Sequence, residues 1–231
     1  MRPLQPDTSY HIFNHANGFE NVFRCEANYY FFLEKYRLYI APIAETYAYC
    51  LMPNHFHLVV RIRKREILIN NFSKVRGFNQ RSSNNQKATN NINIQNFGKV
   101  IIDISDSDIE KYLSKQLANL FSCYTQSFNK VYGRMGSLFI KNFKRVPITD
   151  KRHFLNTVVY THRNPVHHGF CKRYDDWPYS SYNEIVQGTS GDIETVKLLK
   201  MAGGIDGFLQ IHQRSLDTID TNDYPDIPFL I

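Results

Sequence analysis

The stretch from residue 52 to residue 62 constrains the fold most, because a turn signal leads straight into an apolar run. Pro53-Asn54 is typical of a turn, and the apolar, β-branched residues after it predict a strand over His55–Ile62. Side chains alternate across a strand, so one face collects large apolar side chains and becomes the expected core face: Phe56, Leu58, Val60 and Ile62. His55 and His57 share the opposite face, expected to be half-exposed. Two such imidazoles either bind a metal together or are simply solvated.

The charge of the chain is concentrated in one segment. The formal net charge is +7, from 28 Lys and Arg against 21 Asp and Glu. Residues 130–173 hold ten of the cations and one acid, Asp150, so this segment alone carries +9. Such a concentration favours a polyanionic partner, with nucleic acid ahead of a membrane surface. A merely soluble basic surface is the alternative.

The four cysteines lack the paired spacing of a zinc cluster or a disulfide framework, so we predict a cytoplasmic protein in a reducing compartment. We expect neither secretion nor a membrane partner. The N-terminus has no apolar signal region, and no run reaches the ~18 apolar residues of a membrane span.

The order of the predicted elements indicates an α+β fold. We expect strands over residues 10–15, 45–52 and 55–62, a helix over 26–41, and a short extended segment within 137–147. This order fits a ferredoxin-like antiparallel sheet with helices on a face, followed by a C-terminal helical extension. In that extension, residues 196–201 and 205–213 are expected to form one interrupted helix or two short helices.

Capping signals predict the limits of two further helices. Ser107 begins a capping box with Glu110, and Gly133 is a suitable stop, so the first should end near Tyr132. Asp150 is a good N-cap for the second, which should end before Pro165.

Two motifs resemble a known family. Residues 53–59 resemble the His–hydrophobic–His motif of the single-tyrosine HUH transposases. Residues 159–169 and 177–182 are similar to the C-terminal signature of the REP-associated tyrosine transposases, and residues 124–139 resemble the segment between the motifs. The resemblance covers about residues 10–186. It implies a transposase-like catalytic domain over residues 1–188. The stretch at about 70–99 falls outside the resemblance, and its Asn-rich composition with little apolar periodicity predicts a surface insertion or mobile loop of weak or irregular structure. Residues 189–231 form an extension of unknown role.

The resemblance also implies roles for particular side chains. His55 and His57 bind a divalent metal, Asn164 supplies a third ligand through its side-chain oxygen, and Tyr160 is the nucleophile. Mixed nitrogen and oxygen ligation without thiolate is compatible with Mg²⁺ or Mn²⁺. The implied activity is metal-dependent cleavage and strand transfer of single-stranded, hairpin-flanked DNA through a covalent 5′-phosphotyrosine. The base that would activate Tyr160 is not identified.

The basic segment supplies candidate contacts to DNA phosphates: Lys141, Lys144, Arg145, Lys151, Arg152 and Arg163. His162, His167 and His168 also lie near the site and could touch substrate phosphate, but packing or solvation is the favoured interpretation for them. Related transposases can form dimers that share active-site helices, so a homodimer is left open. Two alternatives to a transposase remain: a hydrolytic metal-dependent nuclease on the same scaffold, and a non-catalytic protein that binds DNA hairpins.

Overall fold

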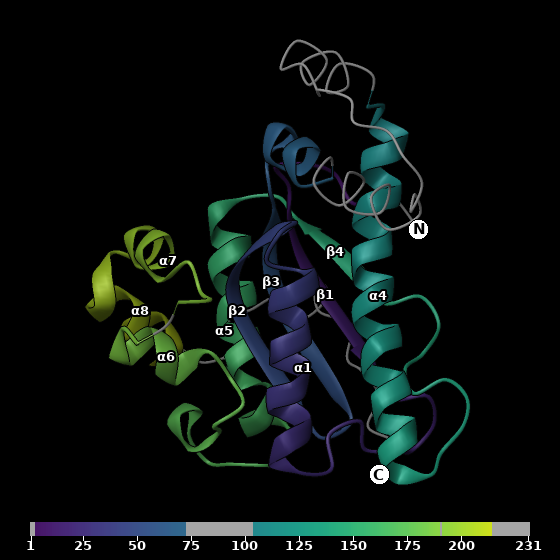
Figure 1. The fold of residues 1–231 in the computed structure, drawn as a ribbon. Helices are drawn as coiled ribbons and strands as arrows, with labels where there is room; N and C mark the ends of the chain where they lie inside the picture. The colour runs from purple at the N-terminus through teal and green to yellow at the C-terminus, as the bar shows by residue number, and fades with distance from the viewer. Residues whose placement is uncertain (1–2, 73–103, 190, 214–231) are drawn as a thin grey trace.

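The computed structural model describes residues 3–72, 104–189 and 191–213 (Figure 1). Its sheet contains β1 (Ser9–His15), β2 (Ala44–Met52), β3 (His55–Ile62) and β4 (Lys144–Ile148). The strands lie in the order β2-β3-β1-β4, and every neighbouring pair is antiparallel. This is the ferredoxin-like order, so the predicted fold class is confirmed.

Helices cover both faces of this sheet rather than one (Figure 1). Helices α1 (Glu26–Tyr39) and α4 (Asp106–Tyr132) pack on the apolar face, where Phe32 of α1 lies 5.4 Å from Phe56 of β3 between ring centroids. Helix α5 (Lys151–His167) covers the other face. The face of β3 expected to be half-exposed is therefore buried, because α5 shields it from solvent.

The N-cap of α4 is Ser105, so the prediction of Ser107 is wrong. The Ser105 hydroxyl accepts from the backbone N–H of Asp108 at 3.2 Å, and the Asp108 carboxylate accepts from the Ser105 N–H at 3.2 Å. Aspartate thus fills the role expected of Glu110, whose carboxylate instead accepts from Gln5. At its other end α4 stops at Gly133, as predicted, with a left-handed φ of 60°.

Helix α5 begins after Asp150 as predicted, but it does not end at Asn164. It continues through Pro165 to His167. The proline lacks an N–H and forfeits one helical hydrogen bond. The last turn still closes, because the Asn164 carbonyl accepts from the His168 N–H at 2.9 Å.

Short helices follow along one side of α5 (Figure 1). They are η1 (Tyr174–Asp176), α6 (Tyr182–Gln187), α7 (Thr195–Ala202) and α8 (Gly204–Gln213). The last two confirm the helices expected in the C-terminal extension. Each buries a fully covered apolar side chain, Leu198 in α7 and Phe208 in α8, so both belong to the packed body of the fold. The division at residue 188 stays a prediction.

The predicted insertion lies mostly outside the described residues. Residues 65–72 are helical, so the prediction of irregular structure is wrong for 70–72, and 73–99 are not described. Among the described residues, no helix combines the length and apolarity that crossing a membrane would need.

Candidate active site

Strand β3 turns His55 and His57 toward α5, and each is 1% exposed. Their ring centroids are 5.2 Å apart. Tyr160, half-buried on α5, presents its ring edge-on to His57 at a centroid distance of 5.6 Å. The predicted pair and the predicted nucleophile therefore lie together, on one face of the sheet and within one chain.

Asn164 lies one helical turn after Tyr160 and joins the same cluster. Its Nδ2 donates to the Tyr160 carbonyl at 2.8 Å, and it is 2% exposed. The pKa of His55 is lowered to about 3, mainly by burial and also by the charges of His168 and His15, while a hydrogen bond with the Asn164 side chain opposes these effects. The structure thus brings together all four residues that the resemblance singled out.

His11 on β1 is a site residue that sequence reasoning missed. It is 1% exposed, and its Nε2 lies 2.9 Å from His57 Nδ1. Its ring centroid is 5.8 Å from that of Tyr160. The only signal in the sequence is the alternation in β1, which places His11, Phe13 and His15 on one face. The contact itself depends on the register between β1 and β3.

The imidazoles of this site are neutral at pH 7. Burial is the main cause that lowers the pKa of His11 to about 3 and that of His57 well below its usual value. Neutral imidazole is the form that binds metal ions. Among the described residues, no group of three or more His, Cys, Asp or Glu side chains is placed to hold a metal. A metal site here would therefore combine the two histidines with a donor of another kind, for which Asn164 is the predicted residue.

The donor set fits a divalent cation. His57 Nε2 is buried without a hydrogen-bond partner among the described residues, while Nδ1 of the same ring faces His11. Metal-binding histidines commonly have one ring nitrogen held by a neighbour and the other directed at the ion. With His55 and the Asn164 amide, the donors are nitrogen and oxygen without thiolate, which is compatible with Mg²⁺ or Mn²⁺.

Comparison with known proteins gives a family likeness for this chain. No family model matches the chain. A curated Haemophilus influenzae protein, named as a REP-associated tyrosine transposase, is 21% identical over 184 residues, which are 80% of this chain and 78% of that protein. The chain is similar to the REP-associated tyrosine transposases. The resemblance seen in the motifs is thereby confirmed.

A solved structure of a REP-associated tyrosine transposase bound to a REP hairpin also matches this chain. The match has a TM-score of 0.47 and 15% identity, and it covers 84% of this chain and 87% of that one. At this TM-score the superposition adds nothing to the sequence likeness to REP-associated tyrosine transposases.

The six predicted DNA contacts are spread over two faces of the sheet. In the register of β1 with β4, Lys144 pairs with Phe13, whose ring stacks on His57, so Lys144 shares the face of Tyr160. Arg145 pairs with Ile12 and lies on the opposite face. The other four are the exposed Lys141 beside β4, the exposed Lys151 and Arg152 in the first turn of α5, and the half-buried Arg163, which hydrogen-bonds Tyr174.

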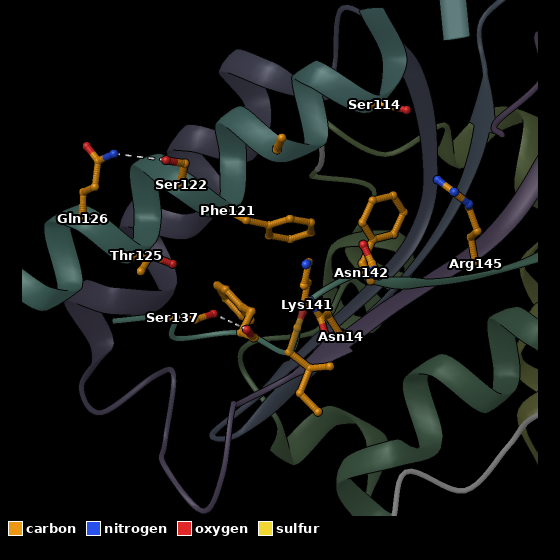
Figure 2. A pocket seen from close by; sticks show the side chains of 14 residues that line it. Asn14, Ser114, Phe121, Ser122, Thr125, Gln126, Ser137, Lys141, Asn142 and Arg145 are labelled. Atoms are coloured by element: carbon orange, nitrogen blue, oxygen red, sulfur yellow. Dashed lines mark hydrogen bonds between the residues drawn. The ribbon is translucent and has the colours of Figure 1, made fainter. Parts of the chain in front are cut away.

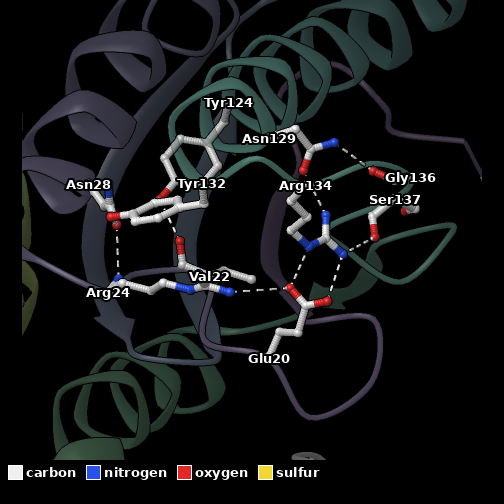
Figure 3. Close-up of polar contacts among 10 residues, drawn as sticks. All are labelled: Glu20, Val22, Arg24, Asn28, Tyr124, Asn129, Tyr132, Arg134, Gly136 and Ser137. Atoms are coloured by element: carbon white, nitrogen blue, oxygen red, sulfur yellow. Dashed lines mark hydrogen bonds and ion pairs between the residues drawn. The ribbon is translucent and has the colours of Figure 1, made fainter.

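Two cations of the basic segment have structural roles instead. Arg134 forms an ion pair with Glu20 at 2.5 Å and also donates to the Ser137 carbonyl at 3.0 Å (Figure 3). Arg173 is paired with Asp175 at 2.7 Å. The charge of the segment that is left for a partner is thus smaller than its +9 suggests.

His162 faces away from the active site into a buried chain of hydrogen bonds. The Phe208 carbonyl accepts from His212 Nδ1 at 2.8 Å, so His212 Nε2 must accept from His162 Nδ1, at 2.9 Å. His162 Nε2 then accepts from the Ser181 hydroxyl at 2.8 Å, and Ser181 accepts from the Tyr49 N–H at 2.9 Å. We call this chain the histidine latch. It links β2 and α8 to the helix that carries Tyr160, which confirms packing as the role of His162.

The other two histidines of the signature differ from each other in position. His167 is exposed, whereas His168 is half-buried with its ring centroid 5.4 Å from that of His55.

Replacing His212 with alanine is expected to lower the free energy of unfolding by about 2–4 kcal/mol, because it leaves a buried N–H of His162 without an acceptor and opens a cavity beside Phe208. Urea titration measures the change. His167→Ala, at an exposed position of α5, is the matched control and should stay within about 0.5 kcal/mol of the wild type. Equal stability of the His212→Ala variant and the wild type would show that the histidine latch contributes nothing to the free energy of unfolding.

Proposed function

We propose that the protein cleaves and rejoins single-stranded, hairpin-flanked DNA through a covalent 5′-phosphotyrosine at Tyr160. The observation that carries this proposal is the convergence of Tyr160, His55, His57 and Asn164 on one face of the sheet. The likeness to the REP-associated tyrosine transposases supports it, because their name describes this class of reaction.

His55, His57 and Asn164 would hold a divalent cation, Mg²⁺ or Mn²⁺. When bound, this cation polarises the scissile phosphate as a Lewis acid. His11 holds the ring of His57 in place through the contact at its Nδ1. Helix α5 fixes Tyr160 beside these ligands, which restricts the approach of the phenol to the phosphate.

In the proposed step the Tyr160 oxygen attacks phosphorus and the bond to the 3′-oxygen breaks. The phenol loses its proton during the attack, because its ordinary pKa is about 10, and the departing 3′-oxygen gains a proton. One phosphodiester replaces another, so the 3′-hydroxyl of another end can reverse the step and join the strands without an energy source. His11 and His55 are poor proton acceptors here, since burial lowers their pKa values to about 3.

The proposed partner is single-stranded or hairpin DNA. Lys141, Lys144, Arg145, Lys151, Arg152 and Arg163 are the proposed phosphate contacts. Lys144 is the best placed of them, because it is exposed on the face that carries Tyr160. A homodimer stays a prediction, and Tyr160 does not need one to reach the histidines.

The test uses hairpin-flanked single-stranded DNA that carries a label on the side retained by a 5′-phosphotyrosine. The protein is incubated with this DNA and Mn²⁺ and run on a denaturing protein gel, with a chelator in a parallel sample. Label that moves with the protein, only in the presence of metal, is the expected result. Cleavage without labelled protein would replace the proposal with a hydrolytic nuclease. Binding without cleavage at any metal concentration would replace it with a hairpin-binding protein.

A further inference from the structure

A pocket lies on the sheet face opposite Tyr160, between α4 and the segment that leads into β4 (Figure 2). It has a volume of about 830 Å³, within the usual range for ligand pockets. Its lining includes two cations, Lys141 and Arg145, and three aromatic rings, Phe121, Phe139 and Phe143, but no acidic side chain. We call it the β4 pocket.

Arg145 carries a charge that no described side chain neutralises. Its Nε is buried without a hydrogen-bond partner, and the residue makes no ion pair among the described residues. Its guanidinium carbon lies 5.0 Å from the centroid of the Phe143 ring. A partly buried cation without a counter-charge is unfavourable, and an anion in the pocket would relieve it.

The rings and amides of the β4 pocket select among anions. Phe121 and Phe143 stand 5.7 Å apart between centroids, so a planar base can stack against this wall. Asn142 adds a side-chain amide, and its left-handed φ of 67° is one that asparagine tolerates. The cations can bind a phosphate, the rings can stack on the face of a base, and the amides can hydrogen-bond its edge. This combination fits a nucleotide better than a bare anion.

The position of β4 connects this pocket to the active site. It is an edge strand of the sheet, and its adjacent residues Lys144 and Arg145 point to opposite faces. We propose that the β4 pocket binds an unpaired nucleotide of the DNA substrate, on a strand whose phosphates pass over the β4 edge from Arg145 to Lys144 and on to Tyr160. This inference rests on the proposed function.

DNA binding in the presence of a chelator tests it, because cleavage is then removed from the measurement. The probe is the hairpin-flanked single strand at several salt concentrations. Arg145→Gln should weaken DNA binding about tenfold. It should also reduce the salt slope, which is the slope of the logarithm of the binding constant against the logarithm of the salt concentration, by about one, as expected for a lost phosphate contact. Phe143→Ala should also weaken binding about tenfold but leave the salt slope unchanged, and Phe143→Tyr should restore it. Lys200→Gln, an exposed cation on α7, is the matched charge control and should bind like the wild type.

A second arm separates a nucleotide site from a simple anion site. Deoxynucleoside monophosphate should compete with the DNA at concentrations where inorganic phosphate does not, and Phe143→Ala should remove the difference. Equal competition by phosphate would overturn the nucleotide assignment. If both pocket variants bind DNA like the wild type while the wild type still forms labelled protein, the pocket is not a DNA site. The proposed strand-transfer function then stands, but without Arg145 among its phosphate contacts. If the wild type binds no DNA, both proposals fail.

Discussion

Replacing Tyr160 with phenylalanine is expected to abolish the covalent protein–DNA product and leave DNA binding unchanged. The substitution keeps the ring that packs 5.6 Å from His57 and 5.8 Å from His11, and removes only the attacking oxygen. Loss of an enzyme nucleophile typically lowers turnover by about 10⁴-fold or more. Single-turnover assays with end-labelled DNA measure the rate, and a binding titration in chelator measures the affinity.

Tyr30→Phe makes the same chemical change on the exposed surface of α1 and should react like the wild type. Cleavage that survives in Tyr160→Phe at the wild-type rate would mean that water or another side chain attacks the phosphate. The fold and the histidine cluster would then serve a nuclease, and the strand-transfer proposal would be withdrawn.

Mild acid is expected to unfold the protein, because five histidines are buried in neutral form: His11, His55, His57, His162 and His212. Burial is the largest cause that lowers the pKa of each, to about 3 for His11 and His55 and about 4 for His212. In the unfolded chain their pKa values return to about 6.5. Below pH 6.5 the histidines of the unfolded state therefore bind protons, whereas the same histidines in the folded state stay neutral.

The free energy of unfolding therefore has its full value above pH 6.5 and falls progressively as the pH drops below 6.5. Each histidine contributes about 1.4 kcal/mol per pH unit in this window, so five together approach the whole stability of a typical domain, about 5–15 kcal/mol, within one to two units. Urea unfolding at pH 7.5, 6.0 and 5.0 in chelator measures the effect. His167→Gln removes an exposed histidine and should keep the wild-type slope, whereas equal unfolding free energies at pH 7.5 and 5.0 would contradict the argument.

Local signals in the sequence were enough to place the strands and to find the two halves of the candidate site. The turn at Pro53 and the alternation after it fix the histidine pair on one face of β3, and helical spacing fixes Tyr160 and Asn164 on one face of α5. Their convergence was expected only through the family resemblance, because spacing within an element says nothing about which elements meet.

The features that sequence missed depend on tertiary contacts. His11 meets His57, 46 residues further along the chain, through the register between β1 and β3. The histidines are buried because α5 crosses their face. Two capping patterns overlap at the start of α4, Ser105 with Asp108 and Ser107 with Glu110. The helix begins at the first of them, so the Glu110 carboxylate is available to accept a hydrogen bond from Gln5. The β4 pocket is assembled from α4 and the chain before β4, which no single-segment pattern can indicate.

The histidine latch has a consequence for the order in which a newly made chain becomes active. His162 lies two residues after Tyr160, but its partner His212 is 50 residues further along. Since a chain leaves the ribosome from its N-terminus, the helix with the nucleophile emerges well before the contact that secures it can form. We infer that prematurely terminated chains carry every proposed active-site residue yet hold Tyr160 loosely. Competence to cut DNA would then require synthesis to reach His212 in α8, 50 residues beyond His162.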